Sequence, residues 1–480
     1  MGIDEKIDVL FKPVADAVSN VVFFSIPFSP DVQVKVILIW LAAAAVFFTF
    51  YLGFVNFRYF FHAIDVVRGK FDVKEDRGQI NNFQALAASI SGTVGLGNIA
   101  GVAVAVSVGG PGAVFWMIVM GFLGMSSKFA EVTLGVKYRK HMDPKNPEEI
   151  SGGPMYYLQA AFDQRKIPYL GRIMGVFFAV CVIAGAIGGG NMFQANQTYY
   201  QLYLVTGGEA GILAGKGWLF GLALAFLVGI VIIGGIKSIA NVSTRLVPLM
   251  CITYLVAGLV VLGYHYQNIP GALMTILHDA FSMEAGIGGL MGGLLVGVQR
   301  ASFSNEAGLG SAAIVHAPAK TDTAIKQGMV GMLGPFIDTV VICTMTALMI
   351  VVSGAHLDGT GVEGVELTSR AMASAVSWFP YVLAFTVFLF AYSTLITWAY
   401  YGQKGLTYIF GEKPWLEMAY KIFFCGCVVI GTSANFDNIV SFTDAMILSL
   451  AFPNIVGLYM LAPEIKRDLK DYIAKLKKQR

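Results

Sequence analysis

The chain has 480 residues and a formal net charge of +3; 56% of its residues are hydrophobic and 13% are charged. Soluble proteins carry about 25% charged residues, so this composition, with a mean hydropathy of +0.67, excludes an ordinary soluble domain. It predicts an all-α polytopic membrane protein.

Eleven apolar stretches are long enough to cross a bilayer, which takes about 20 residues of helix. A segment at 1–33 precedes the first stretch, and a basic tail at 462–480 follows the last. The predicted spans are 34–55, 83–107, 112–137, 173–204, 217–235, 245–264, 286–315, 327–353, 381–404, 417–433 and 438–461.

The spans after 34–55 divide into two sets of five, 83–264 and 286–461, and each set starts with a stretch interrupted by glycines. Five is an odd number of crossings, so one set starts inside the cell and the other starts outside. The sequence therefore predicts one extra N-terminal helix followed by a five-plus-five inverted repeat, an arrangement found in many secondary transporters.

Basic residues predict the orientation of these spans. With the N-terminus outside, most of the 33 lysine and arginine residues fall on the inner side, as the positive-inside rule requires. The C-terminal tail is then cytoplasmic, and its positive charge suits anionic lipid better than nucleic acid. We expect a multi-pass protein of the bacterial inner membrane.

The first interrupted stretch reads SGTVGLGN at 91–98. A glycine inside a helix costs about 1 kcal/mol, so the cluster predicts an unwound segment, which at membrane depth must line a cavity or be buried in protein. The half ending near Gly92 would offer carbonyls to a cation, and the half starting near Asn98 would offer N–H groups to an anion. The alternative is that these glycines only let helices pack closely.

Side chains of the same stretch add neutral oxygens, from Thr93 and Asn98, and Gly95 and Gly97 allow close approach of the backbone. No acidic or basic residue lies between positions 83 and 108. Neutral oxygens favour a sodium ion over a proton as the coupling ion, since a proton needs a carboxylate nearby.

Amide side chains recur at roughly helical spacing in the span 173–204, where the sequence reads GGGNMFQANQ at 188–197. Amides in hydrocarbon need hydrogen-bonding partners, so they either join helices or line a cavity. We expect Gln194 to line the cavity.

The second interrupted stretch reads QRASFSNEAGLGS at 299–311 and contains two ionisable residues, Arg300 and Glu306. Such residues within a membrane are functional candidates; these two are close enough to pair, and they serve either as a gate or as substrate contacts. Asp338 is the best candidate carboxylate if the coupling ion is a proton. Lys128 and Glu131 are three residues apart and are expected to pair on one helix face.

The span 381–404 carries Ser393, Thr394 and Trp398, of which the last two share a helix face. The outer segment 354–380 holds a possible short helix at 369–378, which is either a lid or a solvated connector. The six histidines lack metal-ligand spacing, and no nucleotide-binding or hydrolase motif occurs. We therefore expect no enzyme activity and no cofactor other than sodium as coupling ion.

Several strings resemble the alanine/glycine:cation symporter family, sodium-coupled carriers of small amino acids. They are NNFQALAASISGTVGLGNIAGVA, GGPGAVFWM, GMSSKFAEV, SGGPMYY, GGGNMFQAN, QRASFSNEAGLGSAAIVHA and, more weakly, YSTLITWAYYGQK. The similarity covers most of the chain and implies the inverted-repeat fold of LeuT-type symporters. The string VGLGN also resembles the broken first helix of neurotransmitter:sodium symporters.

The resemblance implies that Thr93, Leu96 and Gly97 contact the amino acid, and that Asn98 and Thr394 bind the ion or the substrate. The family often has Thr where this chain has Leu96 and Asp where it has Ser89, a departure that bears on side-chain range and the ammonium contact. The candidate substrate contacts are Thr93, Gly95, Leu96, Gly97, Gln194, Phe303, Ser304, Asn305 and Trp398; the candidate cation ligands are Gly92, Asn98, Ser393 and Thr394.

Together with this resemblance, the observations predict a sodium-coupled symporter that works by alternating access, and the resemblance implies small neutral amino acids such as alanine and glycine as the imported substrates. Its partners would be the amino acid, sodium and the lipid bilayer, with no nucleic acid and no obligate protein partner. The alternative is a proton-coupled or facilitative amino-acid carrier of the same fold, and a sensor or channel is a third possibility.

Overall fold

The computed structural model describes residues 13, 19–20, 22–29, 32–72, 78–143, 146–282, 286–357, 364–433 and 436–478. Most of the predicted N-terminal segment 1–33 therefore lies outside the described residues. Within the described part, helices dominate, as the composition predicts. The helices before position 282 are α2 (Val36–Tyr51), α3 (Val55–Arg58), α4 (Phe60–Val67), α5 (Asn82–Thr93), α6 (Ala100–Gly109), α7 (Gly112–Lys137), α8 (Pro154–Asp163), α9 (Pro168–Ile187), α10 (Phe193–Val205), α11 (Gly217–Ile233), α12 (Gly235–Tyr264) and α13 (Ile269–Phe281).

The second half contains helices of similar length. They are α14 (Gly286–Asn305), α15 (Ser311–His316), α16 (Ala324–Pro335), α17 (Thr344–Ser353), α18 (Val365–Ala373), α19 (Phe379–Phe410), α20 (Pro414–Gly431), α21 (Phe436–Ser449) and α22 (Ala451–Lys478). Two π-helical segments, η2 (Gly188–Met192) and η5 (Phe336–Cys343), join helices within long spans, and short 3-10 turns are η1 (Leu96–Asn98), η3 (Gly208–Ala210), η4 (Tyr266–Asn268) and η6 (Ala355–Leu357).

Each predicted span coincides with one helix or with successive helices of the described chain. Seven helices there are long and apolar enough to cross a membrane, or eight if the bent pair α5 and α6 counts as one span; α2 and α11 are apolar but shorter. The polytopic helical fold is thus confirmed, whereas the count of eleven and the division into repeats at 83–264 and 286–461 stay predictions.

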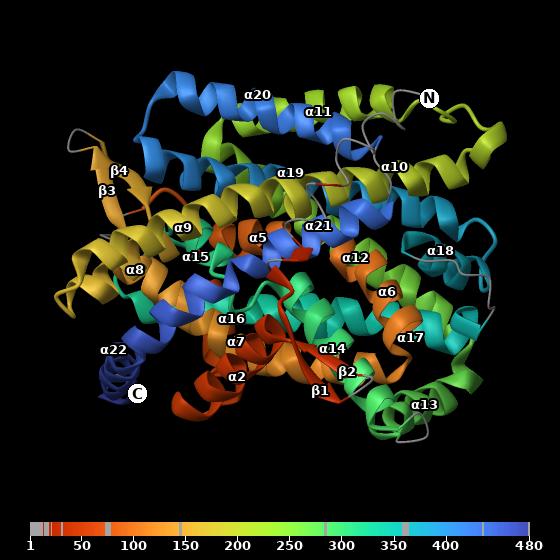
Figure 1. Cartoon of the computed structure of the whole chain (residues 1–480), viewed down its shortest axis with the longest axis horizontal. Coiled ribbons are helices and arrows are strands. Elements are labelled where there is room, and N and C mark those ends of the chain that lie inside the picture. The colour runs from red at the N-terminus through yellow and green to blue at the C-terminus, as the bar shows by residue number, and fades with distance from the viewer. Residues whose placement is uncertain are drawn as a thin grey trace.

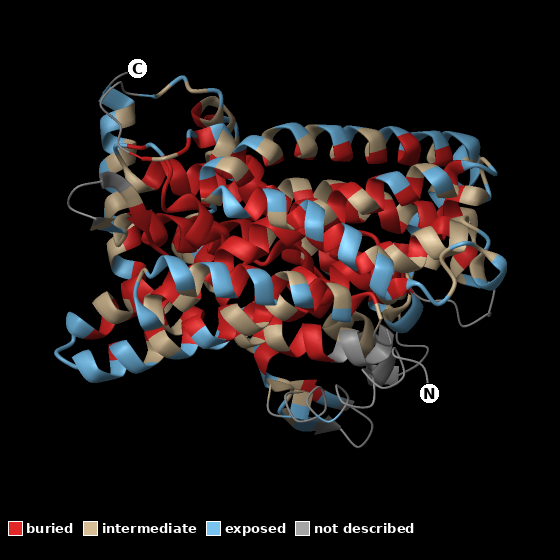
Figure 2. Ribbon diagram, turned by 90° about the horizontal axis from the view of Figure 1, so that it is seen from above, coloured by how far each residue is buried: buried red, intermediate tan, exposed pale blue. Residues whose placement is uncertain are grey.

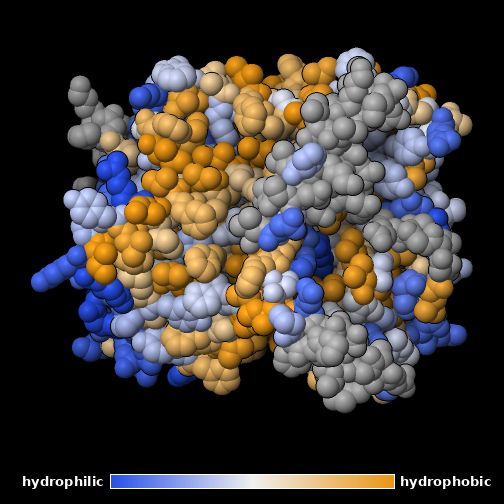
Figure 3. All heavy atoms as spheres, viewed as in Figure 1, coloured by the Kyte–Doolittle hydropathy of each residue, from blue (hydrophilic) through white to orange (hydrophobic). Residues whose placement is uncertain are grey.

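The long helices lie side by side along the longest axis of the molecule (Figure 1). In the same view, hydrophilic residues gather at the left and right ends and an apolar surface lies between them (Figure 3). Buried residues fill the interior of the molecule (Figure 2). Helices α5, α7 and α19 contribute many of them. The apolar belt is the surface that a bilayer would cover.

Two antiparallel hairpins lie outside the spans. Strands β1 (Ser25–Ser29) and β2 (Val32–Lys35) pair before α2, and β3 (Lys140–Asp143) and β4 (Asn146–Ser151) pair in the predicted inner loop 138–171, which also contains α8. In the outer segment, the described helix is α18, which ends at Ala373, so the short helix expected at 369–378 is shifted toward the N-terminus.

One expected loop is helical. The predicted spans 217–235 and 245–264 leave residues 236–244 as an inner loop, but α12 begins at Gly235 and continues without interruption. Its buried residues include Ile236, Ile239, Ala240, Ser243 and Val247, which is the spacing of one helix face. The charged residues Lys237 and Arg245 lie on the exposed face, so an amphipathic turn extends the span.

Candidate functional site

The first helix break lies where the glycines predict it. Helix α5 ends at Thr93, Val94 and Gly95 are extended, and the following helix runs at 60° to α5. The break needs residues without side chains: a Cβ on Gly95 would lie 2.6 Å from the Thr394 hydroxyl, and one on Gly97 would lie 3.1 Å from the Phe303 ring. The interrupted helix is confirmed.

Gln194 bridges the break from the neighbouring span. Its side-chain oxygen accepts from the N–H of Leu96 at 2.9 Å, and its side-chain nitrogen donates to the carbonyl of Gly189 at 2.9 Å. An N–H at the start of a broken half-helix is a natural partner for an anion. In this structure the neutral amide oxygen of Gln194 satisfies it instead.

A small cavity of about 10 Å³ lies beside the break, which is room for a single water molecule. It brings together eight of the predicted site residues with two others, Gly189 and Ile447. The described residues that line it are Gly92, Thr93, Gly97, Gly189, Gln194, Phe303, Glu306, Thr394, Trp398 and Ile447.

Glu306 is the one ionisable residue in this lining. Its carboxylate accepts from the Trp398 indole N–H at 3.0 Å and from the Ser311 hydroxyl, and the indole also lies 3.1 Å from the carbonyl of Gly92. The residue follows directly after α14 and has a left-handed backbone with φ of 55°. A buried carboxylate facing a cavity is a partner for an ammonium group.

A second cluster surrounds Asp338 in η5, next to the first break. One carboxylate oxygen accepts from the Asn98 amide at 2.6 Å, and the other accepts from Ser304 at 2.6 Å and Thr339 at 2.8 Å. The Asn98 side-chain oxygen accepts from the N–H of Gly95 at 2.9 Å. Hard cations prefer oxygen ligands of this kind, so the cluster is a candidate cation site.

Some predicted contacts lie outside the cavity. Ser304 faces Asp338, and Asn305 donates to Thr339 at 2.9 Å and accepts from the N–H of Ala307 at 2.9 Å. Ser393 exchanges hydrogen bonds with Ser91 and so joins α19 to α5. Gly95 and Leu96 border the cavity through their contacts with Gln194 but are absent from its described lining.

The second break follows α14, at positions 306–310, and is also confirmed. Arg300 pairs with Asp444 of α21, so the pairing with Glu306 that the sequence spacing allows is not observed. The reason lies in the fold, because Arg300 is still within α14 while Glu306 lies beyond its end. The expected pair of Lys128 and Glu131 is confirmed at 3.6 Å.

Ile447 and Gly189 escaped the sequence-based prediction because aliphatic and glycine side chains carry no polar signature. A Cβ on Gly189 would lie 2.0 Å from Ile447, and one on Gly190 would lie 2.2 Å from Trp398. The three consecutive glycines at 188–190 were the one available signal, since they let the π-helical segment lie against both side chains.

Comparison with known proteins agrees with this architecture. The model of the Sodium:alanine symporter family matches residues 23–480. The sodium/alanine symporter AgcS of Methanococcus maripaludis is 37% identical over 438 residues, 91% of this chain and 93% of that protein. The amino-acid carrier protein AlsT of Bacillus subtilis is 34% identical, over 92% of this chain and 89% of its own.

Solved structures show the same fold at low identity. MhsT in complex with L-phenylalanine has a TM-score of 0.50 and 14% identity, and the match covers 80% of this chain and 98% of that one. A manganese transporter of Eremococcus coleocola has a TM-score of 0.51 and 13% identity over 81% of this chain and 83% of that one. These likenesses establish a LeuT-type transporter fold.

Proposed function

The chain belongs to the sodium:alanine symporter family and is therefore a multi-pass membrane transporter and not an enzyme, and from that premise we propose that it imports small neutral amino acids, such as alanine and glycine, with sodium. We further propose a bacterial inner-membrane location with the N-terminus outside and the C-terminus in the cytoplasm, which the distribution of basic residues supports.

The charge of the buried site carries this proposal. Among the described residues at the two breaks, three carboxylates, those of Glu131, Glu306 and Asp338, are buried with a single ammonium group, that of Lys128. Burying an unpaired charge costs several kcal/mol. A site with two uncompensated carboxylates favours the joint arrival of two positive charges.

A sodium ion and the ammonium group of an amino acid would supply those two charges. In our proposal sodium binds at Asp338, with the Ser304 hydroxyl as a neighbouring oxygen and with the Asn98 amide turned so that its oxygen, in place of its nitrogen, faces the ion. The ammonium binds at Glu306. The carboxylate of the amino acid takes the N–H of Leu96 once Gln194 has moved away. The carbonyl of Gly92 and the hydroxyl of Thr394 are further candidate contacts, and sodium is the only ion that the proposal needs.

Coupling follows from this charge balance. Each ligand neutralises part of the same buried negative potential, so binding of one favours binding of the other, and the free-energy coupling is reciprocal. A cavity of about 10 Å³ cannot hold an amino acid, so the cavity must widen before substrate enters. Substrate and ion would then stabilise one occluded state together.

The direct test is uptake of labelled alanine into proteoliposomes that contain the purified protein. We expect accumulation above equilibrium only with an inward sodium gradient, because sodium supplies the positive charge that pairs with the Asp338 carboxylate. Equal accumulation with potassium alone would contradict the proposal. Accumulation driven by an inward proton gradient without sodium would instead support the proton-coupled alternative, in which protons neutralise the same two buried carboxylates.

Substrate size provides a second prediction. Replacing Ile447 by Ala should strengthen competition by valine or leucine about 10-fold, since one or more methylene groups in an apolar pocket are worth about 1–3 kcal/mol. The matched control is Leu448→Ala, because Leu448 is its buried neighbour on α21 but does not line the cavity. Competition that changes equally in both variants would show that Ile447 does not bound the substrate side chain.

A further inference from the structure

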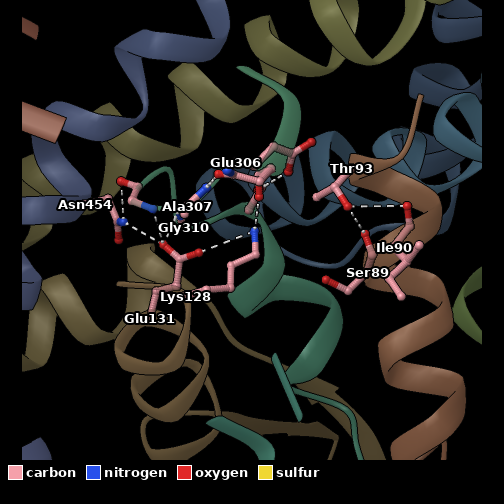
Figure 4. A network of polar contacts seen from close by, with 12 residues as sticks. Ser89, Ile90, Thr93, Lys128, Glu131, Glu306, Ala307, Gly310 and Asn454 are labelled. Carbon is pink, nitrogen blue, oxygen red and sulfur yellow. Dashed lines mark hydrogen bonds and ion pairs between the residues drawn. The ribbon is translucent and has the colours of Figure 1, made fainter. Parts of the chain in front are cut away.

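Two charged residues of α7, Lys128 and Glu131, lie against the second helix break (Figure 4). Both side chains are 0% exposed. Lys128 donates from Nζ to the carbonyl of Asn305, the last residue of α14, at 2.9 Å. The Oε2 atom of Glu131 accepts from the N–H groups of Gly308 at 3.2 Å and Gly310 at 2.9 Å, directly before α15. One ion pair thus contacts both ends of the broken helix.

The signs of these charges match the helix ends. The C-terminal end of a helix presents unpaired carbonyls with partial negative charge, and the N-terminal end presents N–H groups with partial positive charge. The ammonium of Lys128 lies at the C-terminal end of α14, and the carboxylate of Glu131 lies at the N-terminal end of α15. At the first break, by contrast, the N–H of Leu96 is held by the neutral amide of Gln194.

The pair also brackets Glu306. This residue has a left-handed backbone, which is costly for a residue other than glycine and persists only when its surroundings impose it. Lys128 fixes the carbonyl immediately before it, and Glu131 fixes two N–H groups shortly after it. The direction of the Glu306 carboxylate into the cavity therefore depends on both anchors.

Packing makes these anchors rigid. On either side of the pair, a Cβ on Gly124 would lie 2.9 Å from Ala307, and one on Gly135 would lie 2.8 Å from the carbonyl of Ala313. The break thus lies directly on α7. From α22, Asn454 donates to the carbonyl of Gly308 at 2.8 Å and to Glu131 at 3.2 Å.

We propose that Lys128 and Glu131 are a resident ligand of the second break and the positioning residues of Glu306. The pair takes the helix-end groups that an ion would otherwise bind, so transported sodium does not enter this break. It also holds the Glu306 carboxylate where the substrate ammonium binds. The second part rests on the function proposed above, whereas the first part does not.

The test uses the purified full-length protein and the variants Lys128→Met, Glu131→Gln and their combination. The matched control is Thr133→Val, a nearly isosteric change of a fully buried residue on the same helix whose hydroxyl lacks a hydrogen-bond partner among the described residues. Three quantities are measured: the thermal unfolding midpoint, its shift on adding sodium chloride in place of potassium chloride, and the Kd for alanine.

Each single variant leaves one buried charge without its partner and should lower the midpoint, and the double variant should recover much of that loss. The double variant still lacks the donor to the Asn305 carbonyl. We therefore expect its Kd for alanine to be at least about 10-fold higher than that of the control. The shift of the unfolding midpoint on adding sodium chloride should be retained. If the double variant binds alanine with the Kd of the unaltered protein, the pair has only a structural role, and the claim that it positions Glu306 is overturned.

A loss of the sodium-induced shift in the double variant, but not in the control, would place an ion at the second break and overturn the resident-ligand claim. Hydrogen–deuterium exchange over residues 303–311 tests the anchors without any substrate. We expect faster exchange in the double variant than in Thr133→Val; equal exchange would overturn the proposal. If the unaltered protein fails to bind alanine, the proposed function fails while the exchange result still decides the anchoring.

Discussion

Replacing Glu306 by Gln is expected to weaken alanine binding by about 30-fold or more, which corresponds to at least about 2 kcal/mol. The change keeps the volume of the side chain and removes its charge. A glutamine can still accept from the Trp398 indole and donate to the Ser311 hydroxyl, so the local hydrogen bonds survive. What is lost is the carboxylate that would pair with the substrate ammonium.

The same variant should raise the unfolding midpoint of the ligand-free protein. In the empty site the Glu306 carboxylate is buried without a cation of its own, which destabilises the folded state. A neutral amide removes that cost. A drop in affinity with a gain in stability distinguishes loss of a ligand contact from general damage to the fold.

Isothermal titration with alanine in sodium chloride measures the first effect, and a thermal shift without ligand measures the second. Glu209→Gln is the matched control, since Glu209 is an exposed acidic residue in η3, away from the cavity. Unchanged alanine affinity in Glu306→Gln would show that the ammonium binds elsewhere.

Local sequence patterns were sufficient for the elements of the fold. The glycine cluster at 91–98 predicts the position of the first break, because glycine disfavours a helix wherever it stands, whatever the rest of the chain does. The length of each apolar stretch predicts the spans, because a bilayer sets the length that a crossing helix needs. The loop predicted at 236–244 is helical instead, because the buried face from Ile236 to Val247 continues the helical period.

The site was harder to predict because its contacts join distant parts of the chain. Asp444 is the partner of Arg300 at a separation of 144 residues, and Asp338 meets Asn98 at a separation of 240. Neither distance leaves a signal in sequence spacing. The sequence argument for sodium also counted only the acids within the first broken helix, whereas the fold brings Asp338 against that helix from η5.

That juxtaposition makes Asp338→Asn the sharpest test of the coupling ion. We expect the sodium concentration for half-maximal thermal stabilisation to rise about 30-fold or more, since a buried charge pair that loses one partner typically loses at least about 2 kcal/mol. The fold should tolerate the change. The amide oxygen of the new side chain can accept from Asn98, and its nitrogen can donate to the hydroxyls of Ser304 and Thr339.

The two carboxylate variants are reciprocal controls. Asp338→Asn should lose the sodium response while its Glu306 carboxylate remains, and Glu306→Gln should lose alanine affinity while its sodium response remains. A proton-coupled carrier would behave differently, because Asn at position 338 would mimic the protonated acid: alanine uptake would then stop responding to a proton gradient, and sodium would have no effect on either protein. Measuring both variants in sodium and in potassium chloride, at one fixed pH, therefore separates the two coupling ions without reference to any relative.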